Sequence, residues 1–250
     1  MPWREEKEHL AREIVSLLYA HSMIRTFYRD KPEGWTLVSG LYSPLYVQLR
    51  PLVSYPSVFE KVCRALGRMI REEAPELTKI VGIAMAGVPF AAGLALVAGI
   101  SAGFTRKMEK VTSVEAFRKV VEEYGEHALI EGELCDGERI GLVDDLVTRF
   151  DSKLVAIEQV SYEVQRRALK DVECSTVIVL LDREQGGETA ARTHGIRLLS
   201  LVPFKTVGLP LLEGVMEKAE WETLRRYLDE PDRFQDKNVQ SELAKLAARG

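Results

Sequence analysis

Between residues 79 and 204, short runs rich in β-branched residues alternate with segments of helical periodicity. The apolar runs are KIVGIAM (79–85), ISAGFTR (100–106), RIGLVDDL (139–146), TVIVLLD (176–182) and RLLSLVPF (197–204). The helical segments include 88–98, 152–170 and 186–194. Strands that alternate with helices require crossover connections, which place helices over both faces of a parallel sheet. The sequence therefore predicts an α/β fold with a parallel sheet that is covered on both faces.

The segments on either side of this region have a different character. Apolar residues at helical spacing predict helices near 5–22 and over 57–73. Between them, residues 27–51 are rich in Gly, Pro, Ser and aromatic residues, which favours a hairpin or an extended segment. The tail, 210–249, is expected to form two helices that are broken near residues 230–238, with Pro231 as the break.

Composition and charge limit the class of protein. The chain has 250 residues, of which 46% are hydrophobic and 29% charged, so it can bury a sizeable core as one large domain or two small ones. With 34 basic and 38 acidic residues the net charge is −4, which argues against a broad surface for nucleic acid.

The cysteines and the apolar stretches indicate the cellular compartment of the protein. Cys63, Cys135 and Cys174 are widely spaced and odd in number, which favours a reducing compartment. The first ten residues lack the apolar core of a signal peptide, and the longest apolar stretch, near 88–100, is too short to span a bilayer. We therefore expect a cytoplasmic protein that does not bind membranes.

An acidic pair at the end of one strand is the strongest functional signal. Asp144 and Asp145 follow the apolar run IGLV and precede a short turn into a helix. In parallel sheets the ligand lies beyond the carboxyl ends of the strands. Two carboxylates there can accept hydrogen bonds from hydroxyl groups or hold a divalent cation. The alternative is that one acid caps the turn and the other is solvated.

Small and basic residues follow two further strands. Ala86 and Gly87 precede a helix, where small residues allow backbone N–H groups to approach an anion. Arg106, Lys107 and Lys110 follow the next strand and could neutralise a polyphosphate. The alternatives are a tight turn and a solvated basic loop.

Arg183 follows a fourth strand and precedes a glycine pair. A fixed guanidinium at this point could bind a substrate carboxylate through two hydrogen bonds. The alternative is an ion pair with Asp182 or Glu184.

Taken together, the four segments resemble the type I phosphoribosyltransferases, and the orotate phosphoribosyltransferases most closely. The resemblance covers roughly residues 10–205. LVSGLYSPLYVQLR (37–50) is similar to that family's N-terminal substrate segment, AMAGVPFA (84–91) to its pyrophosphate loop, and VDDLVT (143–148) to the first half of its PRPP motif. RKMEK (106–110) and IEGEL (130–134) resemble the two ends of the mobile catalytic loop, and DREQGG (182–187) resembles the orotate-contacting turn.

The resemblance implies transfer of phosphoribosyl from PRPP to orotate, and it implies a role for each site residue. The catalytic cations would be Arg106, Lys107 and Lys110. PRPP would be bound by Ala86, Gly87, Asp144, Asp145, Thr148, Arg149, Asp151 and Ser152. Orotate would be bound by Ser39, Gly40, Thr148 and Arg183.

The same resemblance implies a cofactor, an assembly and a domain division. Mg²⁺ would be bound mainly through PRPP, with Asp144 as the candidate protein ligand, and the protein would be a homodimer. Residues 1–208 would form the phosphoribosyltransferase-like domain, with 1–55 as an N-terminal helix and hood, and 209–250 would be a C-terminal helical extension.

The chain departs from the family in the second half of the PRPP motif. Phe150 stands where a glycine normally allows the backbone to approach the 5′-phosphate. Asp151 is expected to N-cap the next helix, which would put its charge at the phosphate position. Two unit charges about 4 Å apart cost on the order of 4 kcal/mol near a protein surface. Arg149 and Lys153 are the residues that could offset this repulsion.

The catalytic loop also departs from the family. Val114, Phe117, Val120, Val121 and Tyr124 recur at helical spacing, so we expect a helix over 113–124 that packs through Phe117 and Val121.

Two functions remain open from the sequence. One is an active orotate phosphoribosyltransferase, which the cations and the acidic pair favour. The other is a protein of the same fold that acts as a nucleotide-sensing or regulatory subunit, which the stretch 148–153 favours. A DNA-binding regulator is a weaker third option, since no helix-turn-helix or basic stripe is evident.

Overall fold

The computed structural model describes residues 2–37, 40–122 and 127–248, and its chain divides into two compact units. The sheet unit comprises Met1–Lys7 and Phe59–Pro203, and the terminal unit comprises Glu8–Val58 and Phe204–Gly250. The expected division of function at residue 208 stays a prediction. In packing, the C-terminal extension belongs to the same compact unit as residues 8–58.

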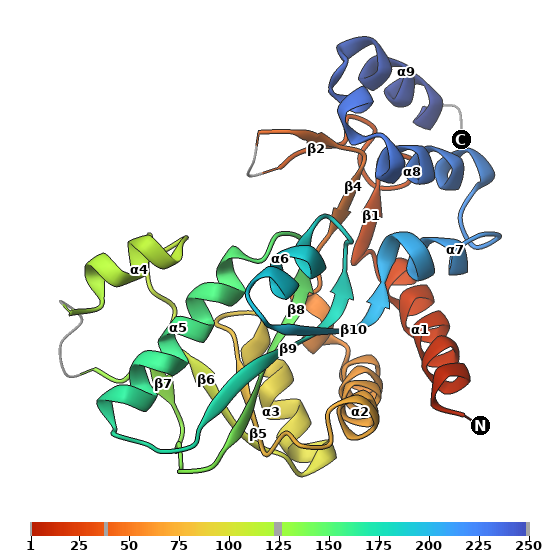
Figure 1. Cartoon of the computed structure of the whole chain (residues 1–250). Helices are drawn as coiled ribbons and strands as arrows, with labels where there is room; N and C mark the ends of the chain where they lie inside the picture. The colour runs from red at the N-terminus through yellow and green to blue at the C-terminus, as the bar shows by residue number, and fades with distance from the viewer. Residues whose placement is uncertain (1, 38–39, 123–126, 249–250) are drawn as a thin grey trace. The chain divides into compact units, whose positions relative to one another are not determined.

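The sheet unit is built on six strands (Figure 1). In chain order they are β5 (Lys79–Gly82), β6 (Ser101–Thr105), β7 (Ile130–Glu131), β8 (Arg139–Val147), β9 (Glu173–Asp182) and β10 (Arg197–Pro203). Their order in space is β10-β9-β8-β5-β6-β7, and every described pairing is parallel except that of β7 with β6. The predicted parallel sheet is confirmed.

Helices of this unit are α2 (Pro56–Glu73), α3 (Gly87–Ala98), α4 (Val114–Val120), α5 (Asp151–Arg166) and α6 (Gly187–Thr193). One face of the sheet packs on α5, since Leu142 and Val177 share a buried cluster with Ala156 and Val160. Gly82 lies on the opposite face, where an added Cβ would lie 3.0 Å from the Cβ of Ala91 in α3. Helices therefore cover both faces, as predicted.

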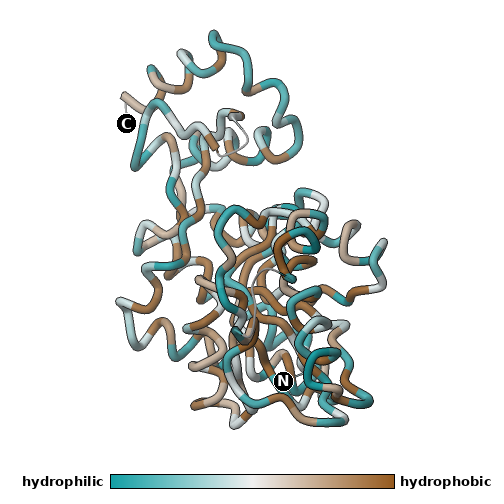
Figure 2. The backbone as a smooth tube through the Cα atoms, turned by 90° about the vertical axis from the view of Figure 1, so that its left-hand side faces the viewer, coloured by the Kyte–Doolittle hydropathy of each residue, from teal (hydrophilic) through white to brown (hydrophobic). Residues whose placement is uncertain are grey.

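Hydrophobic residues concentrate in the strands of the sheet, as Figure 2 shows. The central strands are nearly continuous apolar runs because both of their faces are covered. Among the residues that the structure describes, no helix has a stretch both long and apolar enough to cross a bilayer.

The terminal unit contains four short strands. β1 (Ile24–Thr26) pairs antiparallel with β4 (Leu45–Val47), and β2 (Trp35–Thr36) pairs antiparallel with β3 (Tyr42–Ser43). The extended character expected for residues 27–51 is thus confirmed over these pairs. The N-terminal helix α1 (Trp3–Ala20) precedes them, and the 3₁₀ helix η1 (Arg50–Ser54) follows.

The tail forms α8 (Lys218–Asp229), the 3₁₀ helix η4 (Pro231–Gln235) and α9 (Lys237–Ala247), after a π-helical turn over Phe204–Gly208 and the single turn α7 (Leu209–Leu211). The predicted break at Pro231 is confirmed. Glu220 of α8 is only 1% exposed and accepts hydrogen bonds from the hydroxyl groups of Tyr19 (2.9 Å) and Thr26. A buried carboxylate needs such partners, so this contact fixes the tail to the N-terminal segment of the same unit.

Candidate functional site

The carboxyl ends of four parallel neighbours, β9, β8, β5 and β6, lie along one edge of the sheet (Figure 1). Four predicted segments follow these ends: Arg183 after β9, 144–152 at the end of β8, Ala86 and Gly87 after β5, and 106–110 after β6. The structure therefore brings the segments predicted to bind PRPP and the cationic segment to one edge of the sheet unit. Gly40 belongs to the terminal unit, and Ser39 lies outside the described residues.

Gly87 lies in direct contact with β8. A Cβ added to Gly87 would lie 2.1 Å from the carbonyl oxygen of Val143, a distance that no side chain can adopt. The turn before it is fixed by Ile83 N–H, which donates to Val143 O (2.9 Å), and by Ala84 N–H, which donates to Thr105 Oγ1 (2.9 Å). Glycine is required here for the close approach of helix and strand. This turn is the one that resembles the pyrophosphate loop.

The acidic pair at the end of β8 carries an internal counter-ion. Lys153 is 4% exposed, and its Nζ donates to Asp144 Oδ2 (2.8 Å) and to Leu146 O (2.8 Å). The other Asp144 oxygen accepts from the N–H of Asp145 (2.9 Å). The side chain of Asp144 is thus buried and held in one orientation by these two contacts.

Asp145 has no such cation at hydrogen-bond distance among the described residues, although it is almost as buried as Asp144. Its Oδ1 accepts the N–H of Leu146 (2.8 Å). Burial raises the pKa of Asp145 to about 7, and the nearby charge of Asp144 contributes to the shift. Of the two acids, Asp145 is the one whose carboxylate is available to a ligand hydroxyl group.

The stretch after β8 corrects two expectations. Phe150 is 1% exposed and packs in the core with Val147 and Ala156, so its side chain does not cover the loop backbone. The N-cap of α5 is Phe150, without a side-chain hydrogen bond, and Asp151 is the first residue of the helix. Asp151 was wrongly expected at the N-cap, because the helix begins one residue earlier, at Asp151 itself.

The residues expected to offset Asp151 behave differently from one another. Lys153 is bound to Asp144, whereas Arg149 is exposed beside Asp151 and Ser152, and Thr148 is half-buried. Asp151 also lines a pocket of about 390 Å³ together with residues of α4, α5 and the segment 194–196. The other predicted PRPP-binding residues do not line this pocket.

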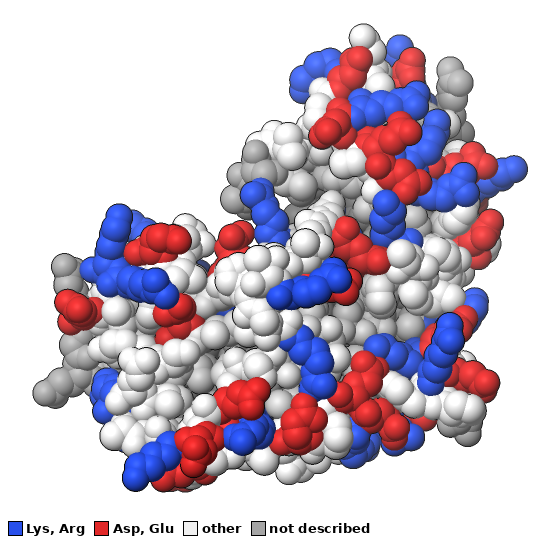
Figure 3. Space-filling view, viewed as in Figure 1, with Lys and Arg blue, Asp and Glu red and all other residues white. Residues whose placement is uncertain are grey.

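The cationic segment after β6, residues 106–110, is held by a hydrogen bond from α5. Arg106 forms an ion pair with Glu131, and its carbonyl oxygen accepts from Gln159 Nε2 of α5 (2.8 Å). Lys107 and Lys110 are exposed, and neither has an ion pair among the described residues. Two of the three predicted cations are therefore available to an anionic ligand. On the face drawn in Figure 3, basic and acidic side chains of the described residues are interspersed.

The far end of the same loop is held by Glu163, which is fully buried in α5. Glu163 accepts from the N–H of Leu129 (2.6 Å) and from Arg166 (2.9 Å) and Arg167 (2.7 Å). Burial alone would raise the pKa of Glu163, but these hydrogen bonds lower it overall. Because α5 also starts at the PRPP-like motif, one helix positions both segments.

Helix α4 confirms the helix that was expected inside the loop. Ser113 caps it by accepting from Ala116 N–H (3.2 Å), and Arg118 pairs with Glu158 of α5 (2.9 Å). Phe117 and Val121 are buried in a cluster that also contains Met108, Leu129 and Val155. The described helix ends at Val120, earlier than expected, and residues 123–126 lie outside the described residues.

Arg183 lies directly after β9 and is buried. Its N–H donates to Val147 O (3.0 Å), which connects the end of β9 to the end of β8. Its neighbour Asp182 accepts the N–H of Glu184 (2.8 Å), and burial raises the pKa of Asp182. The backbone thus places Arg183 next to Thr148, the other residue expected to contact the base.

The described residues do not form a metal site of their own. No group of three or more His, Cys, Asp or Glu side chains among them is arranged to hold a metal ion. Asp144, the candidate ligand, is bound to Lys153 and to the backbone instead.

No family model matches this chain. An orotate phosphoribosyltransferase from Methanothermobacter thermautotrophicus is 31% identical over 199 residues, which covers 78% of this chain and 92% of that protein. The chain belongs to the orotate phosphoribosyltransferase family.

Other members of the orotate phosphoribosyltransferase family match over part of their length. One from Lactobacillus johnsonii is 34% identical over 146 residues (58% of this chain), and the uridine 5′-monophosphate synthase of Caenorhabditis elegans is 28% identical over 214 residues (85% of this chain). The matched regions span 62% and 39% of those two relatives.

Solved structures share the fold. The UMP synthase of Leishmania donovani matches with a TM-score of 0.69 at 25% identity, over 88% of this chain and 42% of that one. The orotate phosphoribosyltransferase of Aeropyrum pernix matches with a TM-score of 0.61 at 24% identity, over 81% of this chain and 97% of that one.

Within this orotate phosphoribosyltransferase-family chain, sequence reasoning missed Gln159 and Glu163 and gave Lys153 a different role. All three are polar residues whose partners lie on other elements. Gln159 and Lys153 are six residues apart and Glu163 is four further on, and polar residues on a helix normally signal a solvated face. Their burial on α5 was the missing information.

Replacing Phe117 with alanine should release α4 from α5. Truncating a buried phenylalanine costs about 3–5 kcal/mol, so amide exchange across 114–120 should accelerate about a hundredfold or more. Hydrogen exchange followed by mass spectrometry measures this. Lys119→Ala, an exposed change in the same helix, should leave the rates unchanged. Fast exchange across 114–120 in the unsubstituted protein would show that α4 is not anchored.

Proposed function

We propose that this protein transfers the 5-phosphoribosyl group from PRPP to orotate in pyrimidine nucleotide synthesis. The C1–oxygen bond of PRPP breaks and pyrophosphate leaves with the bonding electrons, while a ring nitrogen of orotate forms the new bond to C1 and releases its proton to solvent. The observation that supports the proposal best is the acidic pair at the end of β8, beside the Gly87 turn, in a chain of this family.

The described residues support a division of tasks. Asp145 accepts hydrogen bonds from the ribose hydroxyl groups, while Lys153 fixes the orientation of Asp144. Lys107 and Lys110 neutralise the departing pyrophosphate, whose charge grows in the transition state. This electrostatic stabilisation is the main catalytic contribution of the protein.

The remaining predicted residues bind the ends of the two substrates. Ala86 and Gly87 contribute backbone N–H groups to the pyrophosphate, and the first turn of α5 with Arg149 and Ser152 receives the 5′-phosphate. Thr148 and Arg183 contact orotate, and Gly40 with Ser39 completes its recognition. Arg106, already paired with Glu131, acts through that pair on the position of the loop.

The proposal includes Mg²⁺, a homodimer and a cytoplasmic location. Mg²⁺ would be held mainly by the phosphates of PRPP, with Asp144 as the candidate protein ligand, and would neutralise phosphate charge there. The homodimer rests on the family resemblance alone. The cytoplasmic location rests on the three cysteines, which are free in the structure.

Asp151 supports a second candidate, a nucleotide-sensing or regulatory subunit. Its exposed carboxylate stands in the first turn of α5, where it opposes a bound phosphate. Calorimetric titration with PRPP and Mg²⁺ separates the possibilities. Binding at micromolar concentrations agrees with the enzyme, whereas binding of a nucleotide product without PRPP binding favours the regulatory subunit.

A further inference from the structure

Met108 is the buried residue of the cationic segment 106–110. Its side chain is 8% exposed, whereas the residues on either side of it in this segment are exposed. Lys107 comes directly before Met108, and Lys110 follows two positions after it. One apolar side chain thus lies between the two lysines that are available to an anionic ligand.

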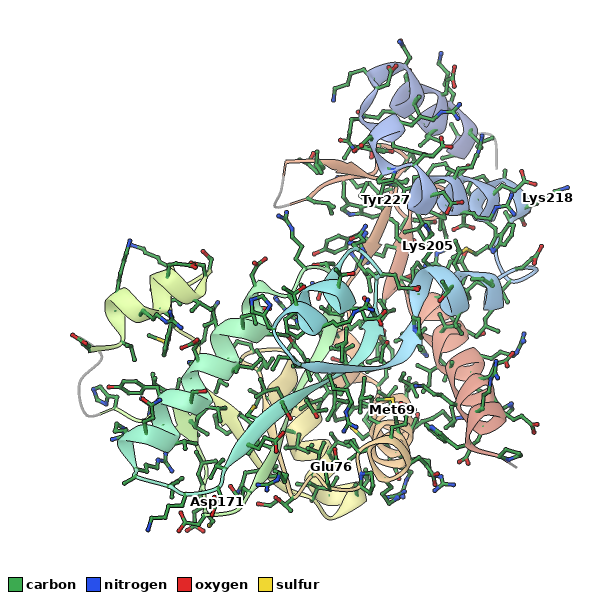
Figure 4. All side chains as sticks on the ribbon, viewed as in Figure 1. Met69, Glu76, Asp171, Lys205, Lys218 and Tyr227 are labelled. Carbon is green, nitrogen blue, oxygen red and sulfur yellow. The ribbon has the colours of Figure 1, made fainter. Side chains whose placement is uncertain are left out.

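The side chain of Met108 packs in a buried cluster to which two helices contribute. Phe117 belongs to α4, Val121 directly follows that helix, Leu129 precedes β7, and Val155 belongs to α5. Figure 4 shows side chains of α4 and α5 that project into the space between these two helices. An unbranched methionine side chain suits such an irregular gap. The cluster therefore ties the cationic segment to both helices.

The backbone before Lys107 is held independently of this cluster. Arg106 N–H donates to Leu129 O (2.8 Å), and Arg106 O accepts from Gln159 Nε2 of α5 (2.8 Å). Gln159 is 3% exposed, and a hydrogen bond that is shielded from water is stronger than an exposed one. Lys107 thus stands between a residue whose backbone is bound at both of its polar groups and a residue whose side chain is buried.

The backbone at Lys110 has a conformation that is unusual for a residue with a side chain. Its φ is 62°, in the left-handed region that favours glycine. Such a conformation persists only where the surrounding structure holds it. Val111, the next residue, packs against the same cluster as Met108. Among the described residues, no backbone hydrogen bond joins residues 107–112 to another segment, so these apolar contacts hold the turn.

Helix α5 connects this cluster to the acidic pair. Val155 of α5 shares the cluster with Met108, and Lys153 of the same helix donates to Asp144 at the end of β8 (2.8 Å). The two lysines and the acidic pair are therefore held from one helix. Cations that are fixed in advance stabilise a growing negative charge without a cost of reorganisation.

We propose that Met108 is a positioning residue that holds Lys107 and Lys110 in place for the departing pyrophosphate before any substrate binds. This inference rests on the proposed function, which assigns the two lysines to pyrophosphate. The contacts that carry it all lie within the sheet unit. Helix α4 then contributes to the reaction, because its apolar face completes the cluster that holds Met108.

The test replaces Met108 with alanine, which shortens the buried side chain and keeps both lysines. The kcat for orotate should fall about ten- to a hundredfold, because a misplacement of about 1 Å is enough for such a loss. The affinity for PRPP in the presence of Mg²⁺, measured by calorimetry, should fall less than kcat does, since the charge on pyrophosphate grows in the transition state. Met108→Leu, which keeps a buried side chain of similar volume, should restore most of the rate. Thr112→Ala, an exposed change in the same loop, is the matched control and should change neither value.

A double-variant comparison separates positioning from a structural role. In the protein that carries Lys107→Ala and Lys110→Ala, the further change Met108→Ala should lower neither kcat nor PRPP affinity, because Met108 acts through these lysines. Met108→Val, a smaller truncation, should give an intermediate kcat and serves as the test where Met108→Ala does not fold. Urea unfolding checks that each variant is folded.

Two results would overturn the positioning role alone. One is an unchanged kcat in folded Met108→Ala, and the other is a further loss when Met108→Ala is added to the lysine variant. An unsubstituted protein that consumes no orotate in the presence of PRPP and Mg²⁺ would overturn the proposed function, and the positioning role with it.

Discussion

Replacing Lys153 with methionine should destabilise the protein by about 3–5 kcal/mol at neutral pH, since removing one partner of a buried ion pair leaves an uncompensated charge. The ammonium group lies 2.8 Å from Asp144 Oδ2, and both side chains are almost fully buried. Methionine has a similar length and no charge, so the change tests the ion pair more than the packing. Urea unfolding followed by circular dichroism measures the loss.

The double variant Asp144→Asn/Lys153→Met is the matched control. It removes both charges together and should recover most of the lost stability, because neutral replacements for a buried pair are often nearly as stable. A K153M protein with the stability of the unsubstituted chain would show that the pair contributes nothing. Equal losses in the single and double variants would show that the lysine acts through packing alone.

Replacing Asp145 with asparagine should change stability and PRPP binding in opposite directions. The pKa of Asp145 is raised from 3.8 to about 7 by burial and by Asp144. The folded state therefore keeps this proton up to about pH 7, while the unfolded state loses it near pH 4. Between about pH 4 and pH 7 the free energy of unfolding therefore falls as the pH rises, by about 1.4 kcal/mol per pH unit for one such proton. Asp145→Asn should remove this part of the pH dependence and be more stable than the unsubstituted protein at pH 8.

The binding of PRPP should weaken in the same variant. Losing a hydrogen bond to a charged acceptor costs roughly 1.5–3 kcal/mol, or about ten- to 150-fold in affinity. The unsubstituted protein should likewise lose PRPP affinity below about pH 7, because protonation removes the carboxylate charge of Asp145. Calorimetric titrations at pH 6 and pH 8 measure both effects. Unchanged PRPP affinity together with lower stability in Asp145→Asn would assign this acid a structural role.

The sequence predicts the architecture well because its signals are local. Alternating apolar runs indicate a parallel sheet, because strands that alternate with helices need crossover connections, whereas the order of the strands comes from the structure alone. Gly87 and Pro231 mark a turn and a helix break through the backbone properties of the residues themselves. These features depend on a few neighbouring residues, which a single sequence displays directly.

The site is predicted less completely because its contacts join distant elements. Lys153 reaches back nine residues to Asp144, and Gln159 binds the backbone of Arg106 in another segment. Phe150 stands at a glycine position of the motif. It is nevertheless a core residue, because its side chain belongs to the buried cluster that includes Val147 and Ala156. From the sequence alone, a lysine that forms a buried ion pair cannot be told from an exposed lysine, and a phenylalanine in the core cannot be told from one in a ligand loop.

Conversion of orotate to orotidine 5′-monophosphate in the presence of PRPP and Mg²⁺, followed by the loss of orotate absorbance, tests the proposed reaction. We expect turnover that depends on PRPP, with pyrophosphate released in equal amount, and a rate that falls strongly in Lys107→Ala and Lys110→Ala. Tight binding of PRPP without any orotate consumption would contradict the proposed reaction.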